Sequence, residues 1–557
     1  MEKVWLKSYA KNVPFEIEFE KVVLPDALSR TAGKYPDNPA LLFQGTKITF
    51  RRLDDMVSRF ATGLRTLGIE PGDRVSILLP NIVQTVVAVY GTLRAGAVAV
   101  MANPLYTDHE LALQFNDAGS NLLVSLDVLV PRMIRLRERT PIRKIVSCHI
   151  RDYLPFPLKQ LFPLVKRRLH LKTPAAAEVY EFTDLVMKNP PVSQPHGAKW
   201  DDPAFLLYTG GTTGTSKGVE LSHGNVSVNV QQVGAWFPGF VPGAEVALGC
   251  LPFFHVFGLT ACLNIAIFYG WADVLVPKPE PKAILENIQR HKVTYVPAVP
   301  TMYNGMIDFP ALKKYDLSSV KGCFSGGAPL PMETIRRFEA LAGAQICEGY
   351  GLTESSPVTH VNPYGAKTKP GTIGLPIPNT NSKLVGVNDY NQEITEPGEP
   401  GELCVKGPQV MREYINRPDE TAIALRDGWL LTGDIAVVDE EGYFSIVDRK
   451  KDMIISGGFN IFPRDVDEVL FAHPKVLEAC SIGVPDAHSG ERVKAFVVLK
   501  KEETATPEEI IEYCREYLAR YKVPKYVDFV EELPKSAVGK ILRKELRRQE
   551  LAKGEGA

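Results

Sequence analysis

The segment Tyr208–Gly218 reads YTGGTTGTSKG and combines glycines, hydroxyl side chains and one lysine. Glycines let backbone N–H groups approach an anion, while hydroxyl and ammonium groups add donors and charge. A flexible linker is the alternative, but the apolar run PAFLLYT precedes the glycines and the strand-like run GVELSH follows them. The segment therefore predicts a phosphate-binding loop, with candidate ligands Thr209, Gly210, Gly211, Thr212, Thr213, Gly214, Thr215, Ser216 and Lys217.

Two common nucleotide-binding patterns do not fit this loop. A Walker loop requires glycine directly before its lysine, whereas Ser216 precedes Lys217. The glycines also lack the Gly-x-Gly-x-x-Gly spacing of a dinucleotide fold. The loop is thus predicted to bind phosphate in another type of enzyme.

Further motifs follow in a fixed order, and together they carry a family resemblance. They are GGAP at 326–329, GYGLTE at 349–354, TGD at 432–434, DRKKDMIISGG at 448–458 and LPKSAVGKILRKEL at 533–546. With these motifs the chain resembles the acyl- and aryl-CoA synthetase, luciferase and nonribosomal adenylation superfamily from about Leu24 to Leu546. Within that superfamily it looks most like bacterial long-chain fatty acid CoA ligases.

The resemblance implies a two-step reaction, in which ATP and a carboxylate form an acyl-adenylate and the thiol of coenzyme A then displaces AMP. It implies that the 208–218 loop holds the β- and γ-phosphates, that Thr353 contacts the α-phosphate and that Glu354 binds Mg²⁺, a cation that prefers oxygen ligands. Alone, Glu354 is an ordinary carboxylate after a turn. The implied adenine contacts are Gly326, Gly327, Ala328 and Tyr350, and the implied ribose contacts are Asp434 and Arg449. Gly349 and Gly351 of the GYGLTE motif are also assigned to cofactor binding.

The resemblance also assigns residues near the C-terminus. Lys540 begins a basic helix that could be a solvated face, but it matches a family lysine that reaches the reacting carboxylate and α-phosphate. Domains are expected at 1–448 (AMP-binding) and 449–557 (mobile), with a hinge near Lys451, where many relatives carry aspartate. Rotation of the small domain would present Gly457 and Gly458 to pantetheine.

His255, in the apolar run FFHVFG, has two interpretations. A lone histidine in such a run is often a satisfied core residue, yet its position matches a family histidine near the acyl carboxylate. It would guide substrate without acting as a base, since a carboxylic acid is already ionised at pH 7. The residues Phe253, Phe254, Val256, Phe257 and Tyr303 are candidates for the acyl tunnel or the core.

These candidate residues require a scaffold, and apolar periodicity predicts one. Strand, helix and strand patterns alternate from Asp73 onward and recur at 282–307 and 319–351, so a large N-terminal α/β domain with mostly parallel sheets is expected. The glycine-rich segments fall where strands end, which is where ligands bind in such folds. After about Lys450 the pattern predicts a small α+β domain, including a helix with Thr506 as N-cap, Pro507 in its first turn and Glu509 placed for a capping box.

Composition limits the binding partners and the cellular location that are expected for the protein. The 557 residues carry 64 basic and 65 acidic side chains, so the chain has almost no net charge with which to attract nucleic acid. The eight cysteines are scattered, which predicts buried thiols in a cytoplasmic protein. The apolar stretch 247–272 reaches the length of a membrane span, but its proline, asparagine and glycines favour a strand followed by a buried helix.

The sequence leaves open whether the protein contacts a membrane and which acyl chain length it prefers. The segment 152–172, DYLPFPLKQLFPLVKRRLHLK, either lies on an anionic membrane surface or packs its apolar side on the body. The predicted function is a long-chain fatty acid CoA ligase using ATP, CoA, fatty acid and Mg²⁺. The alternatives are an aryl or medium-chain acyl-CoA ligase, a fatty acyl-AMP ligase, or a non-catalytic fatty acid binding or translocating protein. Relatives are often dimers, so a homodimer is one candidate assembly, and the sequence leaves the oligomeric state open.

Overall fold

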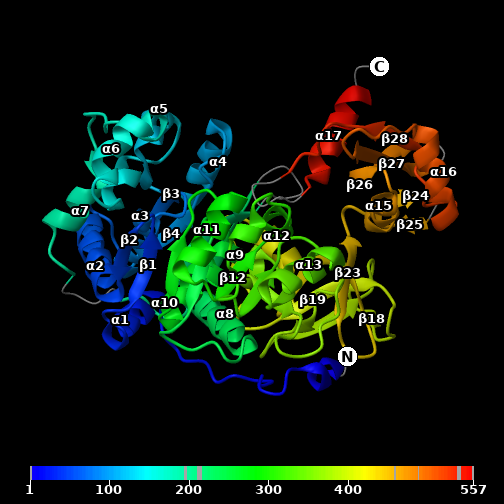
Figure 1. Ribbon diagram of the computed structural model, residues 1–557, viewed down its shortest axis with the longest axis horizontal. Coiled ribbons are helices and arrows are strands. Elements are labelled where there is room, and N and C mark those ends of the chain that lie inside the picture. Colours follow the sequence, from blue (N-terminus) through cyan, green and yellow to red (C-terminus); the bar gives the residue numbers. More distant parts are fainter. Residues whose placement is uncertain are drawn as a thin grey trace. The chain divides into compact units, whose positions relative to one another are not determined.

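The structure is a computed structural model that describes residues 3–192, 197–209, 216–456, 459–486, 489–535 and 541–554 (Figure 1). The chain divides into two compact units. The larger unit comprises Trp5–Asn381 and Lys406–Leu430. The smaller unit comprises Met1–Val4, Ser382–Val405 and Leu431–Ala557. The predicted boundary between 448 and 449 is a different division of the chain and stays a prediction.

The larger unit contains an eight-stranded sheet within the described ranges, and this sheet carries the phosphate-loop hairpin. Strands β3 to β7 run parallel, and β8 is parallel to β4. The order is β20 (Glu413–Tyr414), β9 (Lys217–Ser222), β8 (Pro203–Thr209), β4 (Val98–Met101), β3 (Arg74–Leu78), β5 (Leu122–Leu126), β6 (Lys144–Cys148) and β7 (Val179–Glu181).

A second sheet of the larger unit has nine strands in the same described ranges. Its centre is parallel, and the residues of its central strands β10 to β13 are almost all buried, as expected for a sheet covered on both faces. The order is β16 (Leu375–Pro376), β15 (Val358–Val361), β14 (Gln345–Gly351), β13 (Gly322–Ser325), β12 (Tyr295–Ala298), β10 (Val246–Gly249), β11 (Ala272–Leu275), β1 (Pro39–Phe43) and β2 (Thr46–Thr49).

Helices connect these strands, as the alternating pattern predicts. Helix α3 (Val83–Arg94) is buried along its whole length, and a Cβ on Gly91 would lie 2.6 Å from the Phe60 ring, so glycine permits close packing against α2 (Phe50–Thr66). The other helices are α1 (Leu24–Lys34), α4 (Asp108–Ala118), α5 (Val130–Leu136), α6 (Leu158–Val165), α7 (Phe182–Lys188), α8 (His223–Trp236), α11 (Pro281–His291), α12 (Pro300–Ile307), α13 (Met332–Ala342) and α14 (Pro418–Ala424).

The apolar stretch 247–272 is a strand followed by buried helical turns, as expected. After β10 the chain forms α9 (Val256–Gly258), the π-helical turns of η6 (Leu259–Asn264) and α10 (Ile265–Tyr269). None of the described helices is long and apolar enough to cross a membrane. On the adjacent strand β11, Asp273 is fully buried, neither of its carboxylate oxygens has a hydrogen-bond partner among the described residues, and burial raises its pKa to about 8.

The smaller unit is built on two sheets. The first contains β17 (Asn381–Val385), β18 (Glu393–Ile394), β19 (Gly401–Lys406), β22 (Trp429–Val438) and β23 (Phe444–Arg449), and β21 (Leu425–Arg426) pairs with the start of β22. The second contains β24 (Ile454–Ser456), β25 (Phe459–Ile461), β26 (Val476–Asp486), β27 (Gly490–Leu499) and β28 (Tyr526–Phe529). Its helices are α15 (Pro463–Ala472), α16 (Pro507–Tyr517) and α17 (Arg543–Gly554).

The predicted fold class, α/β with mostly parallel sheets and a small α+β part, is confirmed. Thr506 caps α16 by accepting a hydrogen bond from Glu509 N, but the Glu509 carboxylate pairs with Lys475 Nζ at 2.7 Å. All eight cysteines are free and buried, as expected. The core of each unit is thus apolar and thiol-containing without disulfides.

Candidate active site

The predicted phosphate loop lies between the two strands of a hairpin. Strands β8 and β9 pair antiparallel, and Thr209 lies opposite Lys217 at the open end. The Ser216 hydroxyl donates to the Thr209 carbonyl at 2.7 Å and so closes the base of the loop. Residues 210–215 lie outside the described part of the chain, so the roles of Gly210, Gly211, Thr212, Thr213 and Gly214 stay predictions.

Lys217 is held at the base of this loop by a segment distant in the sequence. Its ammonium forms an ion pair with the Glu420 carboxylate and lies 4.9 Å from the centre of the Tyr414 ring. Strand β20 brings Tyr414 there by pairing with β9, where Tyr414 lies opposite Val219. A Cβ on Gly218 would lie 2.7 Å from the Ile415 side chain, so the close approach of the two strands depends on glycine.

Glu354 reaches the same tyrosine from the second sheet. It lies on the single turn η8 (Thr353–Ser355) that follows β14, and its Oε1 accepts a 2.6 Å hydrogen bond from the Tyr414 hydroxyl. The Met411 amide donates to the Glu354 carbonyl at 2.7 Å. Burial and the neighbouring Glu354 carboxylate raise the pKa of Tyr414, so the phenol remains a donor at physiological pH.

Tyr414 therefore brings together two predicted residues from separate motifs, the ammonium of Lys217 and the carboxylate of Glu354. A lysine and a carboxylate that contact the same tyrosine suit a polyphosphate with its cation, because the ammonium offsets phosphate charge and the carboxylate supplies a hard oxygen ligand. The half-buried Glu354 carboxylate, oriented by one phenol donor, fits Mg²⁺ by its donor chemistry.

The turn that carries Thr353 and Glu354 is braced on both sides. The Ser356 hydroxyl donates to the Gln409 carbonyl at 2.9 Å, and Thr260 of the π-helical turns donates to the Ser356 carbonyl at 2.7 Å. A Cβ on Gly351 would lie 1.9 Å from the Pro357 carbonyl oxygen, which explains the glycine before the turn. These contacts fix Thr353 and Glu354 relative to the strand that precedes them.

The residues assigned to adenine lie at the ends of β13 and β14. Gly326 follows β13, and a Cβ there would meet the Phe257 ring at 3.1 Å and the Gly349 carbonyl at 3.4 Å. A Cβ on Gly349 would lie 2.3 Å from the Phe324 ring. Gly327 has a φ of +82°, the half-buried Ala328 follows it, and the half-buried Tyr350 lies next to Gly349 on β14. The structure thus brings Gly326 and Gly349 together, and adenine contact stays a prediction.

His255 begins the helical turns beside this cluster. Its Nδ1 accepts a 3.3 Å hydrogen bond from the Phe257 amide, and Phe257 is the ring that faces Gly326. The tunnel candidates Phe253, Val256, Phe257 and Tyr303 are buried, and Phe254 is half-buried. His255 is thus a half-buried helix cap, and its proposed contact with the acyl group stays a prediction.

Asn81 is a positioning residue that sequence reasoning missed. It follows β3 of the first sheet and is buried, and its amide donates to the Gly249 and Leu251 carbonyls at 2.9 and 2.7 Å. Its Oδ1 accepts from Phe253 N at 2.9 Å. A buried amide thereby holds the segment that leads to His255, and a single asparagine after a strand carries no sequence signal of that role.

Within the smaller unit, the structure brings the two predicted ribose ligands together. Asp434 and Arg449 face each other across β22 and β23, and Arg449 Nε lies 3.3 Å from Asp434 Oδ1. Gly433, with a φ of +71°, precedes Asp434, and its amide donates to Glu402 Oε1 at 3.2 Å. The Asp434 side chain is almost fully buried, so its orientation is fixed by this strand pair.

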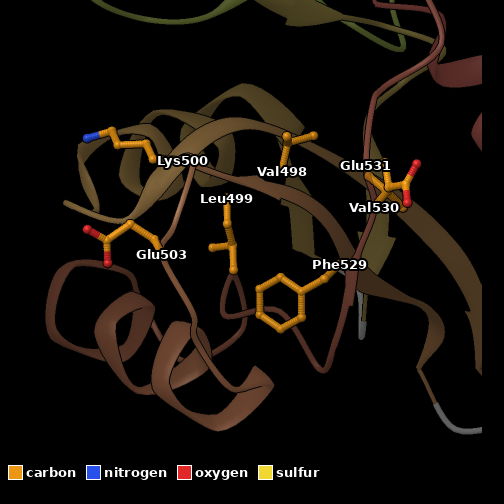
Figure 2. A pocket seen from close by; sticks show the side chains of 7 residues that line it. All are labelled: Val498, Leu499, Lys500, Glu503, Phe529, Val530 and Glu531. Atoms are coloured by element: carbon orange, nitrogen blue, oxygen red, sulfur yellow. The ribbon is translucent and has the colours of Figure 1, made fainter.

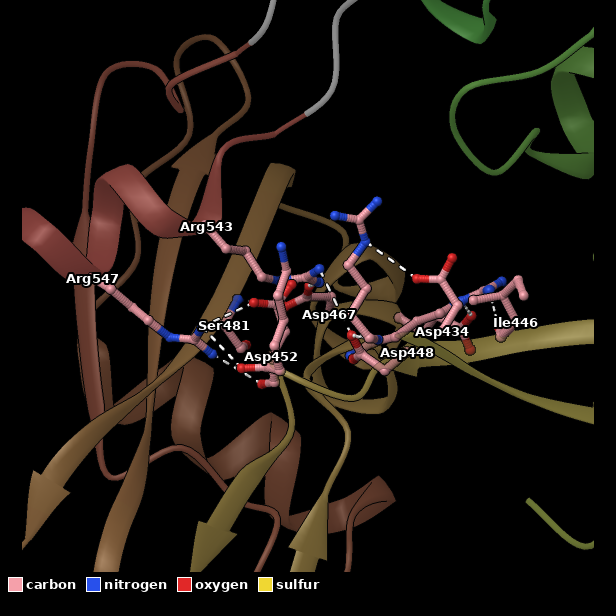
Figure 3. A network of polar contacts seen from close by, with 12 residues as sticks. Asp434, Ile446, Asp448, Asp452, Asp467, Ser481, Arg543 and Arg547 are labelled. Atoms are coloured by element: carbon pink, nitrogen blue, oxygen red, sulfur yellow. Dashed lines mark hydrogen bonds and ion pairs between the residues drawn. The ribbon is translucent and has the colours of Figure 1, made fainter. Parts of the chain in front are cut away.

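The segment proposed as a hinge is tied to α17 by arginines (Figure 3). Arg547 donates to Asp452 Oδ1 at 2.9 Å and to the Lys451 carbonyl at 3.3 Å. Arg543 lies 2.6 Å from Asp467 Oδ2 and 3.9 Å from Asp448 Oδ1. Lys540, Gly457 and Gly458 lie outside the described residues, so their roles stay predictions.

A pocket elsewhere in the smaller unit is not part of this site (Figure 2). It lies where the end of β27 meets the end of β28, and no predicted ligand lines it. The lining residues are Val498, Leu499, Lys500, Glu503, Phe529, Val530 and Glu531.

Comparisons with known proteins agree with the motifs. The model of the AMP-binding enzyme family matches residues 28–415, and that of its C-terminal domain matches residues 465–540. A long-chain-fatty-acid–CoA ligase of Bacillus subtilis (strain 168) is 44% identical over 99% of this chain and 98% of its own. One of Escherichia coli O157:H7 is 39% identical over 98% of each chain. A crystal structure of an anthranilate CoA ligase with anthranoyl-AMP has a TM-score of 0.84 at 26% identity, over 97% of this chain and 99% of that one.

Proposed function

Because this chain belongs to the AMP-binding enzyme family, we propose that it is a long-chain-fatty-acid–CoA ligase that forms AMP and pyrophosphate. The resemblance drawn from the motifs is confirmed by the family match. The observation that carries the proposal is that Tyr414 contacts both the Glu354 carboxylate and the Lys217 ammonium. Identity to ligases named for long-chain acids is 37–44% across almost the whole chain, against 36% over 93% of this chain to a feruloyl-CoA synthase of Amycolatopsis and 26% to the anthranilate ligase.

In the first step a carboxylate oxygen of the fatty acid attacks the α-phosphorus of ATP, and the bond to pyrophosphate breaks. Lys217 and the hydroxyls of the loop would hold the departing phosphates, and Thr353 would donate to the α-phosphate. Glu354 would bind Mg²⁺, which offsets phosphate charge when present. Tyr414 keeps Glu354 oriented, and Lys540 would add positive charge where the two anions meet.

In the second step the CoA sulfur attacks the acyl carbonyl and AMP leaves with the bonding electrons, while the thiol proton passes to solvent. Asp434 and Arg449 would hold the ribose in both steps. We assign the hinge between steps to the neighbourhood of Lys451, whose carbonyl is bound by Arg547. A homodimer is the candidate assembly.

Peripheral membrane contact is the second element of the proposal. Helix α6 has no buried residue, and the side chains around it are unusually exposed, with Phe156, Leu164 and Val165 at 83%, 65% and 70%. Basic residues interleave with them, including Lys159, Lys166 and Arg168. Exposed apolar side chains among cations match an anionic lipid surface, where fatty acids partition. This exposure favours the membrane alternative over packing against the body.

The test of the proposal is AMP release by the purified chain with and without CoA, across acids from acetate to oleate plus coumarate. The highest kcat/KM is expected for acids of long chain, with AMP release dependent on CoA. A maximum of kcat/KM with coumarate or with medium-chain acids would show that the substrate is an aryl or medium-chain acid and not a long-chain one. Pyrophosphate release that continues beyond one turnover, is not raised by CoA and yields free acyl-AMP would indicate an acyl-AMP ligase. Absence of ATP–pyrophosphate exchange would indicate a binding protein.

A further inference from the structure

Three polar side chains meet at the end of the eight-stranded sheet opposite to the Lys217 hairpin. Asp127 follows β5, His149 follows β6, and His170 follows the short turn η5 (Arg167–Leu169). One oxygen, Asp127 Oδ2, lies 2.8 Å from His149 Nδ1 and 3.1 Å from His170 Nδ1. Asp127 is fully buried and His149 is 7% exposed, so these groups are withdrawn from bulk water.

A second layer of groups orients these side chains. His149 Nε2 lies 3.1 Å from both Glu181 Oε2 and Thr173 Oγ1. The Leu171 amide donates to Asp127 Oδ2 at 2.8 Å. The imidazole of His149 is therefore held between two carboxylates, with one ring nitrogen directed at each.

We propose that Asp127, His149 and His170 form a site for a divalent transition-metal ion, with Zn²⁺ as the best match. The three ligand atoms lie within 4.8 Å of one another. Two imidazoles and one carboxylate suit zinc, whereas Mg²⁺ and Ca²⁺ prefer oxygen ligands alone. Tetrahedral ligands about 2.0–2.2 Å from one ion lie roughly 3.3–3.6 Å apart. The two nitrogen–oxygen separations of 2.8 and 3.1 Å would therefore have to widen by only about half an ångström to hold the ion.

The contact with Glu181 distinguishes this cluster from an ordinary buried histidine. Metal-bound histidines usually donate their second ring N–H to a carboxylate, which fixes the ring and its tautomer. His149 has that partner in place through Nε2. Metal binding would displace the protons by which the two Nδ1 atoms contact Asp127, and the bond from Nε2–H to Glu181 would remain.

The site would also fix a neighbouring surface element. His170 comes directly after the segment 155–169, which contains α6 and whose described side chains are mostly exposed. A metal bound to His170, His149 and Asp127 would tie the C-terminal end of this segment to the ends of β5 and β6. The ion would therefore have a structural role, and its site lies beside β5 and β6, away from the β8–β9 hairpin that carries Lys217.

The experiment is a zinc titration of the full metal-free chain in competition with a chromophoric chelator. Wild type is expected to bind one equivalent of Zn²⁺ with nitrogen and oxygen ligation in X-ray absorption spectra. Glu181→Gln, which leaves the three ligands intact, is expected to weaken binding about 10- to 100-fold. His170→Gln should weaken it at least as much, and His109→Gln, at an exposed position on α4, should have no effect.

Circular dichroism spectra and the melting temperature without metal establish that each variant folds. Equal zinc affinity in wild type and His170→Gln would overturn the site. So would sulfur ligation in the absorption spectrum, or no stoichiometric binding by wild type. Mg²⁺ added in excess should not displace the zinc.

Discussion

The hydroxyl of Tyr414 donates a 2.6 Å hydrogen bond to Oε1 of Glu354, although 60 positions separate the two residues. The same ring lies 4.9 Å from the Lys217 ammonium. One edge-strand residue thereby aligns a carboxylate and a cation that come from different sheets.

Tyr414→Phe keeps the ring beside Lys217 and removes the bond to Glu354. A hydrogen bond to a charged group contributes about 1.5–3 kcal/mol, so we expect the rate of ATP–pyrophosphate exchange at low Mg²⁺ to fall at least about tenfold. Tyr180→Phe is the matched control, because it removes a 2.9 Å tyrosine–glutamate bond at β7, the opposite edge of the same sheet. Equal effects of the two variants would contradict the role of Tyr414.

Lys540→Ala is expected to lower acyl-adenylate formation by about 10²- to 10³-fold, because it removes charge from two approaching anions. Thioester formation from supplied acyl-adenylate should be largely spared. Both half-reactions are measured separately, by pyrophosphate exchange and by thioester release. Lys544→Ala, which removes the next lysine along the chain, is the control, and an equal loss in both half-reactions of Lys540→Ala would refute the assignment.

Reversing the charge of Lys166, Arg167 and Arg168 to glutamate should weaken binding to vesicles that contain anionic lipid. Each basic residue near such a surface contributes about 1 kcal/mol, so the partition coefficient should fall by orders of magnitude. Activity on detergent-dispersed fatty acid should not change. Neutral vesicles serve as the lipid control. An unchanged partition coefficient of the triple variant would contradict the proposed membrane contact.

Asp273 predicts a pH dependence of stability. Its pKa is raised to about 8 in the folded chain, above the value of about 4 in an unfolded one, so the folded state retains the proton over this interval. The contribution of Asp273 to the free energy of unfolding is therefore largest at low pH, and it is lost as the pH rises through the pKa of the folded state. Relative to Asp273→Asn, wild type should lose up to about 1.4 kcal/mol per pH unit between pH 5 and 8. Melting temperatures of both proteins over this range test it, and parallel curves would contradict it.

Arg543→Ala should destabilise the smaller unit by about 3 kcal/mol at pH 8, because it leaves the buried carboxylate of Asp467 without its cation. Burial raises the Asp467 pKa to about 6, so the loss should shrink below that pH, where the carboxyl takes up a proton. The control Arg548→Ala breaks an exposed ion pair on the same helix and should change stability by less than about 0.5 kcal/mol. Denaturant unfolding at pH 5 and 8 distinguishes them, and similar losses for both arginines would refute the prediction.

Local pattern predicted the elements well, because apolar periodicity and capping are properties of adjacent residues. The alternation that gives β3, α3 and β4, the buried turns after β10, and the Thr506 cap all follow from such patterns. The predicted family followed from motif order, and the predicted α/β fold class followed from the alternation of strand and helix patterns.

The tertiary partners could not be predicted in the same way. Tyr414 is an isolated aromatic residue, and only the pairing of β20 with β9 brings it to Lys217. His149 and His170 are separated by the segment that contains α6, and both contact Asp127. His149 reaches Asp127 because the parallel strands β5 and β6 end at one edge. The Glu509 carboxylate pairs with Lys475 because that lysine, from a distant segment, lies within reach. Each of these contacts depends on register between strands or segments, which periodicity does not encode.

The tight surroundings of Gly349 and Gly351 bear on how the family evolves. A methyl group at either position would collide with the Phe324 ring or the Pro357 carbonyl in the protein without any nucleotide. Selection for a folded chain alone would therefore retain both glycines. A descendant that lost ligase activity would keep Gly349 and Gly351, whereas Tyr414 and Lys217 would be free to change, and their substitution would be the earlier sign of lost activity.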